Sequence, residues 1–264
     1  MHNDNSGDAS LKISIITVCY NSAETIEDTL RCIAGQTYQN VEYIVIDGGS
    51  TDGTMDIIKR YESHISILVS EPDKGIFDAM NKGWQRATGD VVAFLNSDDT
   101  YMHKDVLQEV AAVMADSDID ACHSDLIYVD RKDTDKIIRY WRGHEHRQGD
   151  CLNGWMPAHP TFFARRSLFE RFGGFDIRYR KQADFVMAVS WFELHKIRSR
   201  YVNEIWTRMR TGGASNNSLR SIIKSNIDCY RACKELGFNV TPFFIVKKIL
   251  SRFPQYWRKP KAAV

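Results

Sequence analysis

Four short apolar segments near the beginning of the chain lack the polar alternation of a strand with one face in water. They span residues 13–18, 41–46, 65–69 and 91–95. Between them, apolar residues recur at helical spacing, as Ile26, Leu30 and Ile33 do. Strands that are apolar on both faces and alternate with helices are typical of a parallel sheet covered on both sides. We therefore predict an α/β fold with a Rossmann-like, mainly parallel sheet flanked by helices.

The residues that follow these segments are the first place to look for chemistry. In open parallel sheets, ligands bind beyond the carboxyl ends of the strands. Three of the four segments are followed by carboxylates, and the four ends comprise Cys19–Asn21, Asp47–Ser50, Ser70–Asp73 and Asn96–Asp99.

Two common nucleotide sites are excluded by the same residues. The dinucleotide motif G-x-G-x-x-G is missing after the first segment. Gly48 and Gly53 have P-loop spacing, but Thr54 and Met55 follow instead of Lys and Ser or Thr. Carboxylates can handle a phosphorylated ligand only with a hard divalent cation between the two anions. The acidic turn at 96–99 either supplies that cation site or caps the next helix, which we expect near Lys104.

Charge divides the chain into two regions. The net charge of +1 combines +8 on residues 219–264 with −7 on the rest, so a basic C-terminal region follows an acidic body. The six cysteines form no C-x-x-C pair, which predicts reduced thiols in a cytoplasmic protein. No stretch approaches the ~18 apolar residues of a membrane-spanning helix, so we expect a soluble or surface-bound protein.

Four stretches resemble, in order and spacing, the inverting glycosyltransferases of family 2, which have the GT-A fold. They read ISIITVCYN (13–21), VIDGGSTDGT (45–54), SEPDKGIFDAMNKG (70–83) and FLNSDDTY (94–101). The resemblance covers residues 11 to about 215 and is greatest to the branch that builds bacterial surface polysaccharides. It implies transfer of one sugar, with Mn²⁺ or Mg²⁺, from a nucleoside-diphosphate-sugar, a UDP-sugar, to a saccharide hydroxyl. The implied acceptor is lipid-linked, in O-antigen, capsule or exopolysaccharide synthesis.

The resemblance also implies site residues. Those expected to bind the nucleotide-sugar are Tyr20, Asn21, Asp47, Asp73, Asn96 and Asp98. The family's D-x-D signature appears here as Asn96-Ser97-Asp98, so Asp98 is the expected metal ligand and Asp99 the second choice. Asp47 can also accept backbone N–H groups of residues 50–53 in an Asx turn, and both uses can coexist.

Asp184 is the expected general base, because the family places an acidic residue followed by an aromatic one near a helix start in its second half. The alternative is a carboxylate that stabilises the helix N-terminus by ~0.3–1 kcal/mol. His159 and Thr161 could line the acceptor side, although a buried, hydrogen-bonded histidine is an equal interpretation. Gly213 and Ser215, after Arg208 and Arg210, either belong to a loop that closes over the diphosphate or to a plain linker.

We predict three regions: a disordered lead-in at 1–10, a GT-A domain at 11–215, and a basic helical arm at 216–264. The domain would divide into a nucleotide-binding half, 11–101, and an acceptor-binding half, 102–215. Within 243–261, a helical wheel predicts an apolar face that includes Val246 and Leu250 and a polar face that includes Lys247 and Lys248. Phe244 is the one apolar residue that falls on the polar face. This helix either contacts the inner face of the plasma membrane peripherally or packs on the domain.

Other functions compete with this one. A nucleotide-sugar binding module without catalysis is supported by Asn96, which replaces an acidic residue. A sugar-1-phosphate nucleotidyltransferase would need a glycine-rich, basic loop where Tyr20–Ser22 stand. A processive synthase would need a Q-x-x-R-W sequence, which is missing. We predict no nucleic-acid partner.

Overall fold

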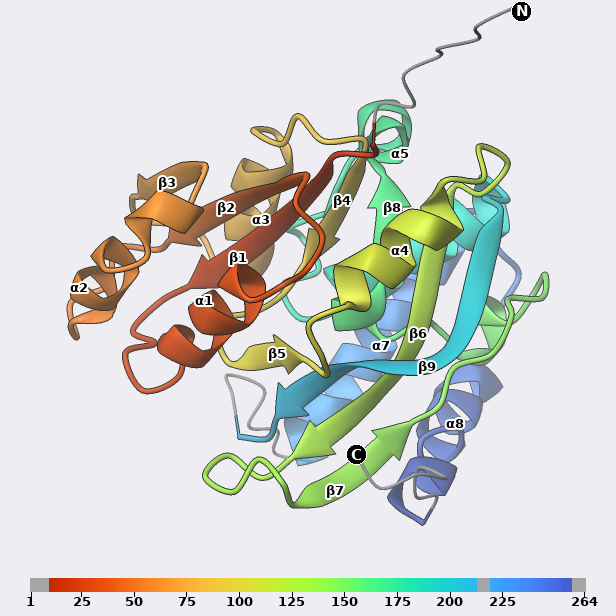
Figure 1. Ribbon diagram of the computed structural model, residues 1–264. Coiled ribbons are helices and arrows are strands. Elements are labelled where there is room, and N and C mark those ends of the chain that lie inside the picture. Colours follow the sequence, from red (N-terminus) through yellow and green to blue (C-terminus); the bar gives the residue numbers. More distant parts are fainter. Residues whose placement is uncertain (1–9, 213–218, 258–264) are drawn as a thin grey trace, which may run out of the picture.

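The first four strands form a parallel sheet in the computed structural model, which describes residues 10–212 and 219–257 (Figure 1). These strands are β1 (Ile13–Cys19), β2 (Val41–Asp47), β3 (Ile67–Ser70) and β4 (Val91–Phe94). They lie in the order β3-β2-β1-β4, and Cys19, Asp47 and Ser70 are in register at their carboxyl ends. The loops predicted to carry the chemistry therefore leave the sheet along one edge.

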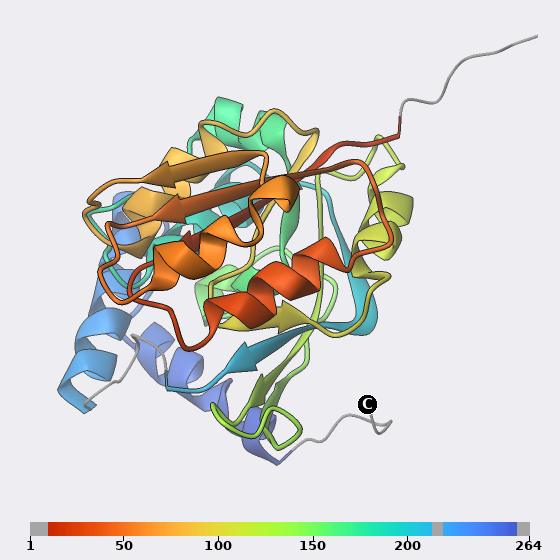
Figure 2. The ribbon, with the colours of Figure 1, turned by 60° about the vertical axis from the view of Figure 1, so that its left-hand side comes forward.

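Helices cover both faces of this sheet (Figure 2). The helices α1 (Ile26–Ala34) and α2 (Thr54–Lys59) lie on one face, and α3 (Ile76–Trp84) lies on the other. Ile15 and Val45 pack on the α1 side, whereas Ile16 and Ile44 pack on the α3 side. All four are buried, which explains why the strands show no polar alternation. The predicted α/β fold is confirmed.

The second half of the chain extends the sheet with strands of both directions. Its elements are β5 (Asp99–Tyr101), α4 (Val106–Met114), β6 (Ala121–Val129), β7 (Ile137–Trp141), η2 (Cys151–Asn153), η3 (His159–Thr161), β8 (Phe163–Arg165), α5 (Arg166–Phe172), α6 (Ala183–Ala188), the π-helical η4 (Val189–Leu194) and β9 (Ser199–Arg210). After β4 the order continues β8-β6-β9-β5, and β7 pairs with β6. The antiparallel pairs β5–β9 and β4–β8 join the two halves into one sheet.

The C-terminal helices α7 (Leu219–Glu235) and α8 (Phe243–Leu250), followed by η5 (Phe253–Tyr256), pack on the domain. Phe244 is buried against Phe185 of α6. Lys248 is buried too: its Nζ lies 2.7 Å from Cys229 Sγ and 3.5 Å from the centroid of the Phe185 ring. The predicted polar position of Lys248 is therefore wrong, because α8 turns Phe244 and Lys248 inward.

Close packing of α8 depends on a glycine. Gly154 has φ +92°, and a Cβ there would lie 2.5 Å from Cβ of Lys248. A side chain at this position would be strained by the backbone and would push α8 away from the domain.

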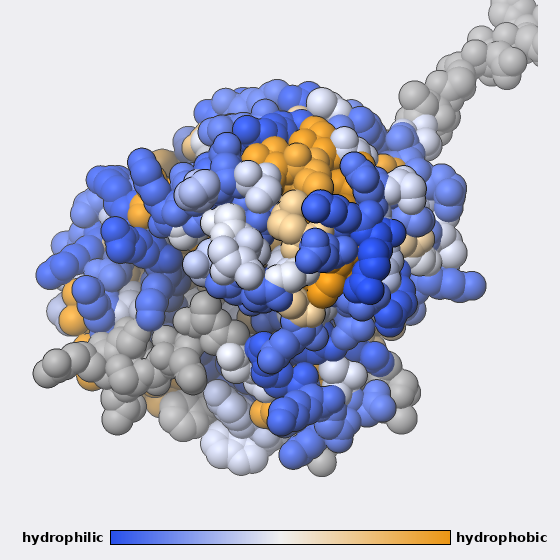
Figure 3. Space-filling model, turned by 90° about the vertical axis from the view of Figure 1, so that its left-hand side faces the viewer, coloured by the Kyte–Doolittle hydropathy of each residue, from blue (hydrophilic) through white to orange (hydrophobic). Residues whose placement is uncertain are grey.

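β3 forms one edge of the sheet and has no strand partner on its outer side within the described residues. Figure 3 faces this edge and shows hydrophobic residues grouped there within a hydrophilic surround. Ile67, Leu68 and Val69 are half-buried.

Two sequence predictions concern composition and chain ends. All six cysteines are free thiols, and no helix among the described residues is long and apolar enough to cross a membrane. The predicted lead-in, apart from Ser10, and the predicted loop residues Gly213 and Ser215 lie outside the described residues.

Candidate functional site

Hydrogen bonds join the loops after β1, β2 and β4. The side-chain oxygen of Asn21 accepts the N–H of Thr51 at 2.9 Å, and the backbone N–H of Asn21 donates to Ser50 Oγ at 2.8 Å. Ser22 Oγ lies 2.9 Å from Ser97 Oγ. Asn21 has φ +48°, a conformation that asparagine tolerates better than most residues. The loops of 20–22, 47–54 and 96–99 therefore converge, and Asn21 acts in part by holding them together.

Asp47 is fully buried at the end of β2. Its carboxylate accepts N–H groups of Gly49 and Ser50 and the hydroxyl of Ser70, the last at 2.7 Å. Burial alone would raise the pKa of Asp47, but these hydrogen bonds lower it. The Asx-turn use predicted for Asp47 is present, and contact with a nucleotide stays a prediction.

The side chains of Tyr20 and Asp73 approach Gly48 beside this turn. The Tyr20 side chain is 63% exposed. A Cβ at Gly48 would lie 2.4 Å from Asp73 Oδ2 and 3.4 Å from Tyr20 Cδ2. Asp73 is held by its other oxygen, Oδ1, which accepts the N–H of Gly75 at 2.7 Å. The Tyr20 ring and a carboxylate oxygen of Asp73 thus lie close to the backbone of Gly48, which has no side chain to displace them. The sequence interpretation missed this role of Gly48.

The acidic turn follows β4 and enters β5. Asp99 is fully buried and pairs with Met209 of β9, while Asp98 is half-buried. The side chain of Asn96 donates to Asp99 Oδ2 at 3.1 Å, and Thr29 of α1 donates to the Asp99 carbonyl at 2.8 Å. The helix α4 begins after Asp105. The alternative in which this turn caps the next helix is therefore wrong.

The donor set of this turn fits a hard divalent cation. Asn96 Oδ1 and Asp99 Oδ1 are buried and lack hydrogen-bond partners among the described residues. Burial raises the pKa of Asp98, and burial together with the Asp98 charge raises that of Asp99 well above its ordinary value. Adjacent carboxylates with unpaired oxygens are the ligands that Mg²⁺ and Mn²⁺ prefer.

Positive charge lies beside the turn. The charges of Arg131 and Arg210 oppose the rise in the pKa of Asp98. Arg210 Nη2 contacts Asp28 Oδ2 at 2.5 Å, while its buried Nε and Nη1 lack partners among the described residues. The buried Nε of Arg208 lacks one as well. One of the two sequence interpretations put Arg208 and Arg210 before a loop that closes over the diphosphate, but the sequence gave no sign of Arg131.

Asp184 is the second residue of α6, and its Oδ1 accepts the N–H of Phe185 at 2.8 Å. It lies close enough to His159 to affect its pKa. Burial lowers the pKa of His159, and the negative charge of Asp184 opposes this lowering. The His159 ring stacks on Phe94, the last residue of β4, at 5.5 Å between centroids, and its buried Nε2 lacks a partner among the described residues. The fold therefore brings Asp184 toward the strand end that precedes Asp98.

Thr161 does not face a ligand. It is fully buried, and its hydroxyl donates to the carbonyls of Ser124 and Ala158, each at 2.9 Å. The expectation that Thr161 lines the acceptor side is corrected: this hydroxyl holds η3 against β6.

Comparison with known proteins gives a consistent picture. The family model "Glycosyl transferase family 2" matches residues 14–173. A PGL/p-HBAD biosynthesis glycosyltransferase of Mycobacterium bovis is 31% identical over 214 residues, which cover 80% of this chain and 81% of the relative.

Solved structures share the fold at low sequence identity. S. aureus TarS 1–349 in complex with UDP-GlcNAc aligns with a TM-score of 0.65 at 17% identity, covering 92% of this chain and 73% of TarS. The mannosyltransferase PcManGT of Pyrobaculum calidifontis, in complex with GDP-Man and Mn²⁺, aligns with a TM-score of 0.64 at 18% identity, covering 93% and 70%.

Proposed function

The chain belongs to glycosyltransferase family 2, and from that premise we propose that it transfers a single sugar from a UDP-sugar to a hydroxyl of a lipid-linked saccharide. The transfer inverts the anomeric configuration. The product belongs to a surface polysaccharide, and the M. bovis relative is likewise named as a biosynthesis glycosyltransferase.

One observation carries the proposal. The Tyr20 and Asp73 side chains beside Gly48, the acidic turn with Asp98, and Asp184 lie at one end of the sheet, where the linked loops and the His159–Phe94 stack connect them. A nucleoside, a diphosphate and an acceptor hydroxyl each need one of these features. The bound UDP-GlcNAc of TarS and the GDP-Man with Mn²⁺ of PcManGT are consistent with this use of the fold.

The side chains divide the work. Tyr20 and Asp73 hold the nucleoside, while Asp98 and Asp99 hold Mn²⁺ or Mg²⁺. The cation supplies positive charge to the diphosphate when it is bound. The unpaired N–H groups of Arg208 and Arg210 add donors for the same anion. Asp184 takes the proton of the acceptor hydroxyl as that oxygen bonds to the anomeric carbon and the bond to the diphosphate breaks.

Thermal stabilisation tests this proposal directly. UDP-, GDP- and dTDP-sugars are added with and without Mn²⁺, and we expect UDP compounds to raise the unfolding temperature only with the metal. Release of UDP from the stabilising donor then reports catalysis. Asp98→Ala should abolish the stabilisation by UDP, while Asp118→Ala, an exposed acidic control, should keep it. No stabilisation by any donor would refute the proposal.

The exposed face of α8 supports membrane contact. Phe243 and Leu250 are 58% and 57% exposed, and Val246 lies between them on the same helix face. Lys247 and Arg252 are exposed nearby. An apolar face bordered by basic residues suits an anionic membrane surface, where a lipid-linked acceptor resides.

Flotation with vesicles of phosphatidylcholine and phosphatidylglycerol tests this contact. Phe243→Ser combined with Leu250→Ser should reduce the bound fraction with little loss of stability, because both side chains are more than half exposed. Ile223→Ser, on the exposed side of α7, is the matched control. Equal flotation of the double variant and the control would remove membrane contact from the proposal.

A further inference from the structure

Two cavities lie where the C-terminal helices meet the domain, and the strand-end loops line neither of them. The cavity between β7 and η5 has a volume of about 290 Å³. That is close to the lower end of the range for small-molecule sites, about 300–1,000 Å³. Its lining combines aromatic and polar side chains, among them Trp141, His144, Asp150, Asn153, Trp155 and Arg252.

Hydrogen bonds to Glu193 hold one wall of this cavity in place. The ligand atoms of His146, Cys151 and Glu193 lie within 4.8 Å of one another, as in a metal site. However, buried Glu193 already accepts the side chain of Gln148 at 2.6 Å and the N–H groups of Gly149 and Cys151 at 2.7 and 2.9 Å. Glu193 therefore anchors the loop that carries His144 and Asp150.

The opposite wall is held by the C-terminal segment. The guanidinium of Arg139 in β7 donates to Gln255 Oε1, at 2.7 Å from Nε. It also lies over the ring of Tyr256, 5.2 Å from the centroid. These contacts fix η5, and with it Arg252, against β7.

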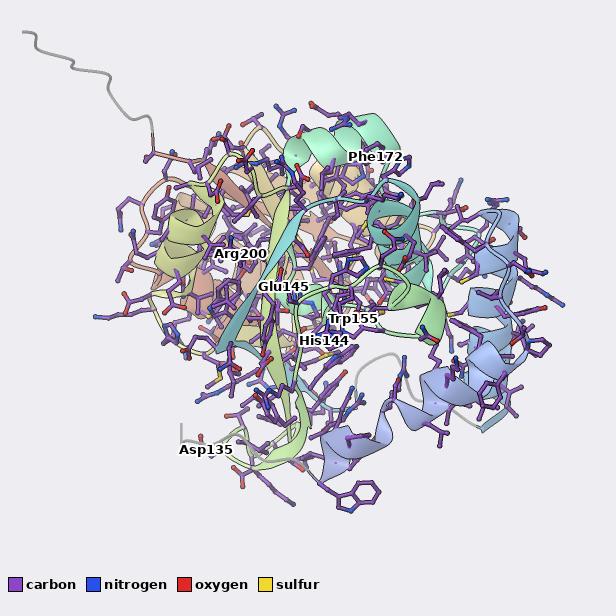
Figure 4. All side chains as sticks on the ribbon, turned by 90° about the vertical axis from the view of Figure 1, so that its right-hand side faces the viewer. Asp135, His144, Glu145, Trp155, Phe172 and Arg200 are labelled. Carbon is purple, nitrogen blue, oxygen red and sulfur yellow. The ribbon has the colours of Figure 1, made fainter. Side chains whose placement is uncertain are left out.

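Aromatic rings are concentrated on one side of the cavity. The Trp155 ring lies 5.0 Å from that of His144 and 5.5 Å from that of His146, measured between centroids. Figure 4 shows His144 and Trp155 together near the middle of this face. Trp155 Nε1 is buried and lacks a hydrogen-bond partner among the described residues. Such a donor calls for an acceptor that the protein itself does not supply.

The combination suits a sugar ring. A pyranose has C–H groups that pack on the negative face of an aromatic ring, and hydroxyls that pair with planar carboxylate, amide and guanidinium groups. Asp150 stands beside the basic groups in the same lining, which disfavours a bare phosphate. Trp155 is four residues from His159, so the two Cα atoms are at most about 14 Å apart. A short oligosaccharide can span that distance.

We propose that this cavity is a saccharide subsite that holds one ring of the acceptor at a distance from the reacting hydroxyl. The inference rests on the proposed transferase function and adds to it a requirement for an acceptor of more than one sugar. Because η5 and Arg252 form one wall, the C-terminal helices take part in acceptor recognition.

Saturation-transfer NMR with methyl glycosides and disaccharides of common hexoses tests the subsite without catalysis. The protein is first saturated with UDP and diamagnetic Mg²⁺, so that the nucleotide position is filled. We expect at least one probe to bind, and Trp141→Ala and Arg252→Gln to weaken it about fivefold or more, the scale of one lost aromatic contact. Arg200→Gln, an exposed arginine of the same face that lies outside the lining, should bind like the wild type.

Two results would overturn the subsite. One is that no probe binds the wild type up to tens of millimolar, and the other is that both cavity variants bind like the Arg200 control. Unfolding temperatures of each variant establish that it is folded, and the exposed Arg252 makes its variant a safe second test should Trp141→Ala unfold. Failure of UDP to stabilise the wild type would refute the transferase function separately, because glycoside binding needs no donor.

Discussion

Replacement of Gly48 by alanine tests whether Tyr20 and Asp73 hold the nucleoside. The added Cβ would lie 2.4 Å from Asp73 Oδ2, whereas ordinary contacts begin at 3.4 Å, so the carboxylate must move by about 1 Å. A hydrogen bond stretched by that amount is lost. A bond to a charged group contributes about 1.5–3 kcal/mol, so we expect the affinity for UDP with Mn²⁺ to fall about 10- to 100-fold by calorimetry.

Stability should hardly change in this variant. Gly48 is not among the glycines with positive φ, so its backbone accepts a side chain. The displaced atoms are the end of one side chain, and we expect a change of less than about 1 kcal/mol in urea unfolding. Gly35→Ala is the control, because its Cβ meets only the carbonyls of Arg31 and Cys32, at the end of α1. Unchanged UDP affinity in a folded Gly48→Ala protein would refute our assignment of Asp73 to the nucleoside.

Three further predictions concern carboxylates. Asp184→Asn should keep UDP affinity but lower turnover about 100-fold, the effect of losing a general base, and wild-type turnover would mean that another group is the base. Asp98→Ala should weaken UDP binding at least tenfold with Mn²⁺ but not without it, as calorimetry can measure; equal losses in both conditions would contradict metal ligation. Burial would raise the pKa of Glu42, but hydrogen bonds from Ser14 and Thr88 lower it from 4.5 to about 2. That stabilises the fold by about 3 kcal/mol at pH 7, a contribution present above pH 4.5 and lost as the pH falls toward 2. Glu42→Gln should therefore destabilise the protein in urea much more at pH 7 than at pH 3, and an equal loss at both would count against it.

The first half of the fold could be predicted because its strands are buried on both faces. The apolar runs at 13–18 and 41–46 differ by one residue from β1 and β2. Local composition is enough where most residues of a strand are apolar and its few polar residues do not alternate with them. The same runs located the polar loops at their ends, and with them the acidic turn.

The second half depends on pairing between distant segments. β9 carries polar residues such as Arg200 and Glu204, and it becomes a strand by pairing with β6, which lies about 80 residues earlier. A partner so far away leaves no local periodicity in β9. β7 follows β6 directly in the chain and pairs with it as a hairpin, but the charged residues around it gave no strand pattern.

Single side chains were misplaced for the same reason. Lys248 was predicted on the polar face of its helix because it is charged. In the structure its amine is buried and contacts Cys229, Gln182 and Phe185. Gly48 drew attention only as part of a failed P-loop match. Its importance comes from Asp73, which approaches it from another loop.

The buried amine of Lys248 links the last helices to the segment that carries Asp184. Gln182 and Phe185, its contacts at the start of α6, flank that carboxylate in the sequence. A chain shortened before α8 would therefore lose more than a terminal helix, because it would have a hollow lined by a carboxamide and a thiol beside the helix that carries Asp184. Chimaeras that exchange C-terminal ends between relatives would need to transfer Lys248 together with Gln182, Phe185 and Cys229, because the lysine and its contacts form one buried cluster.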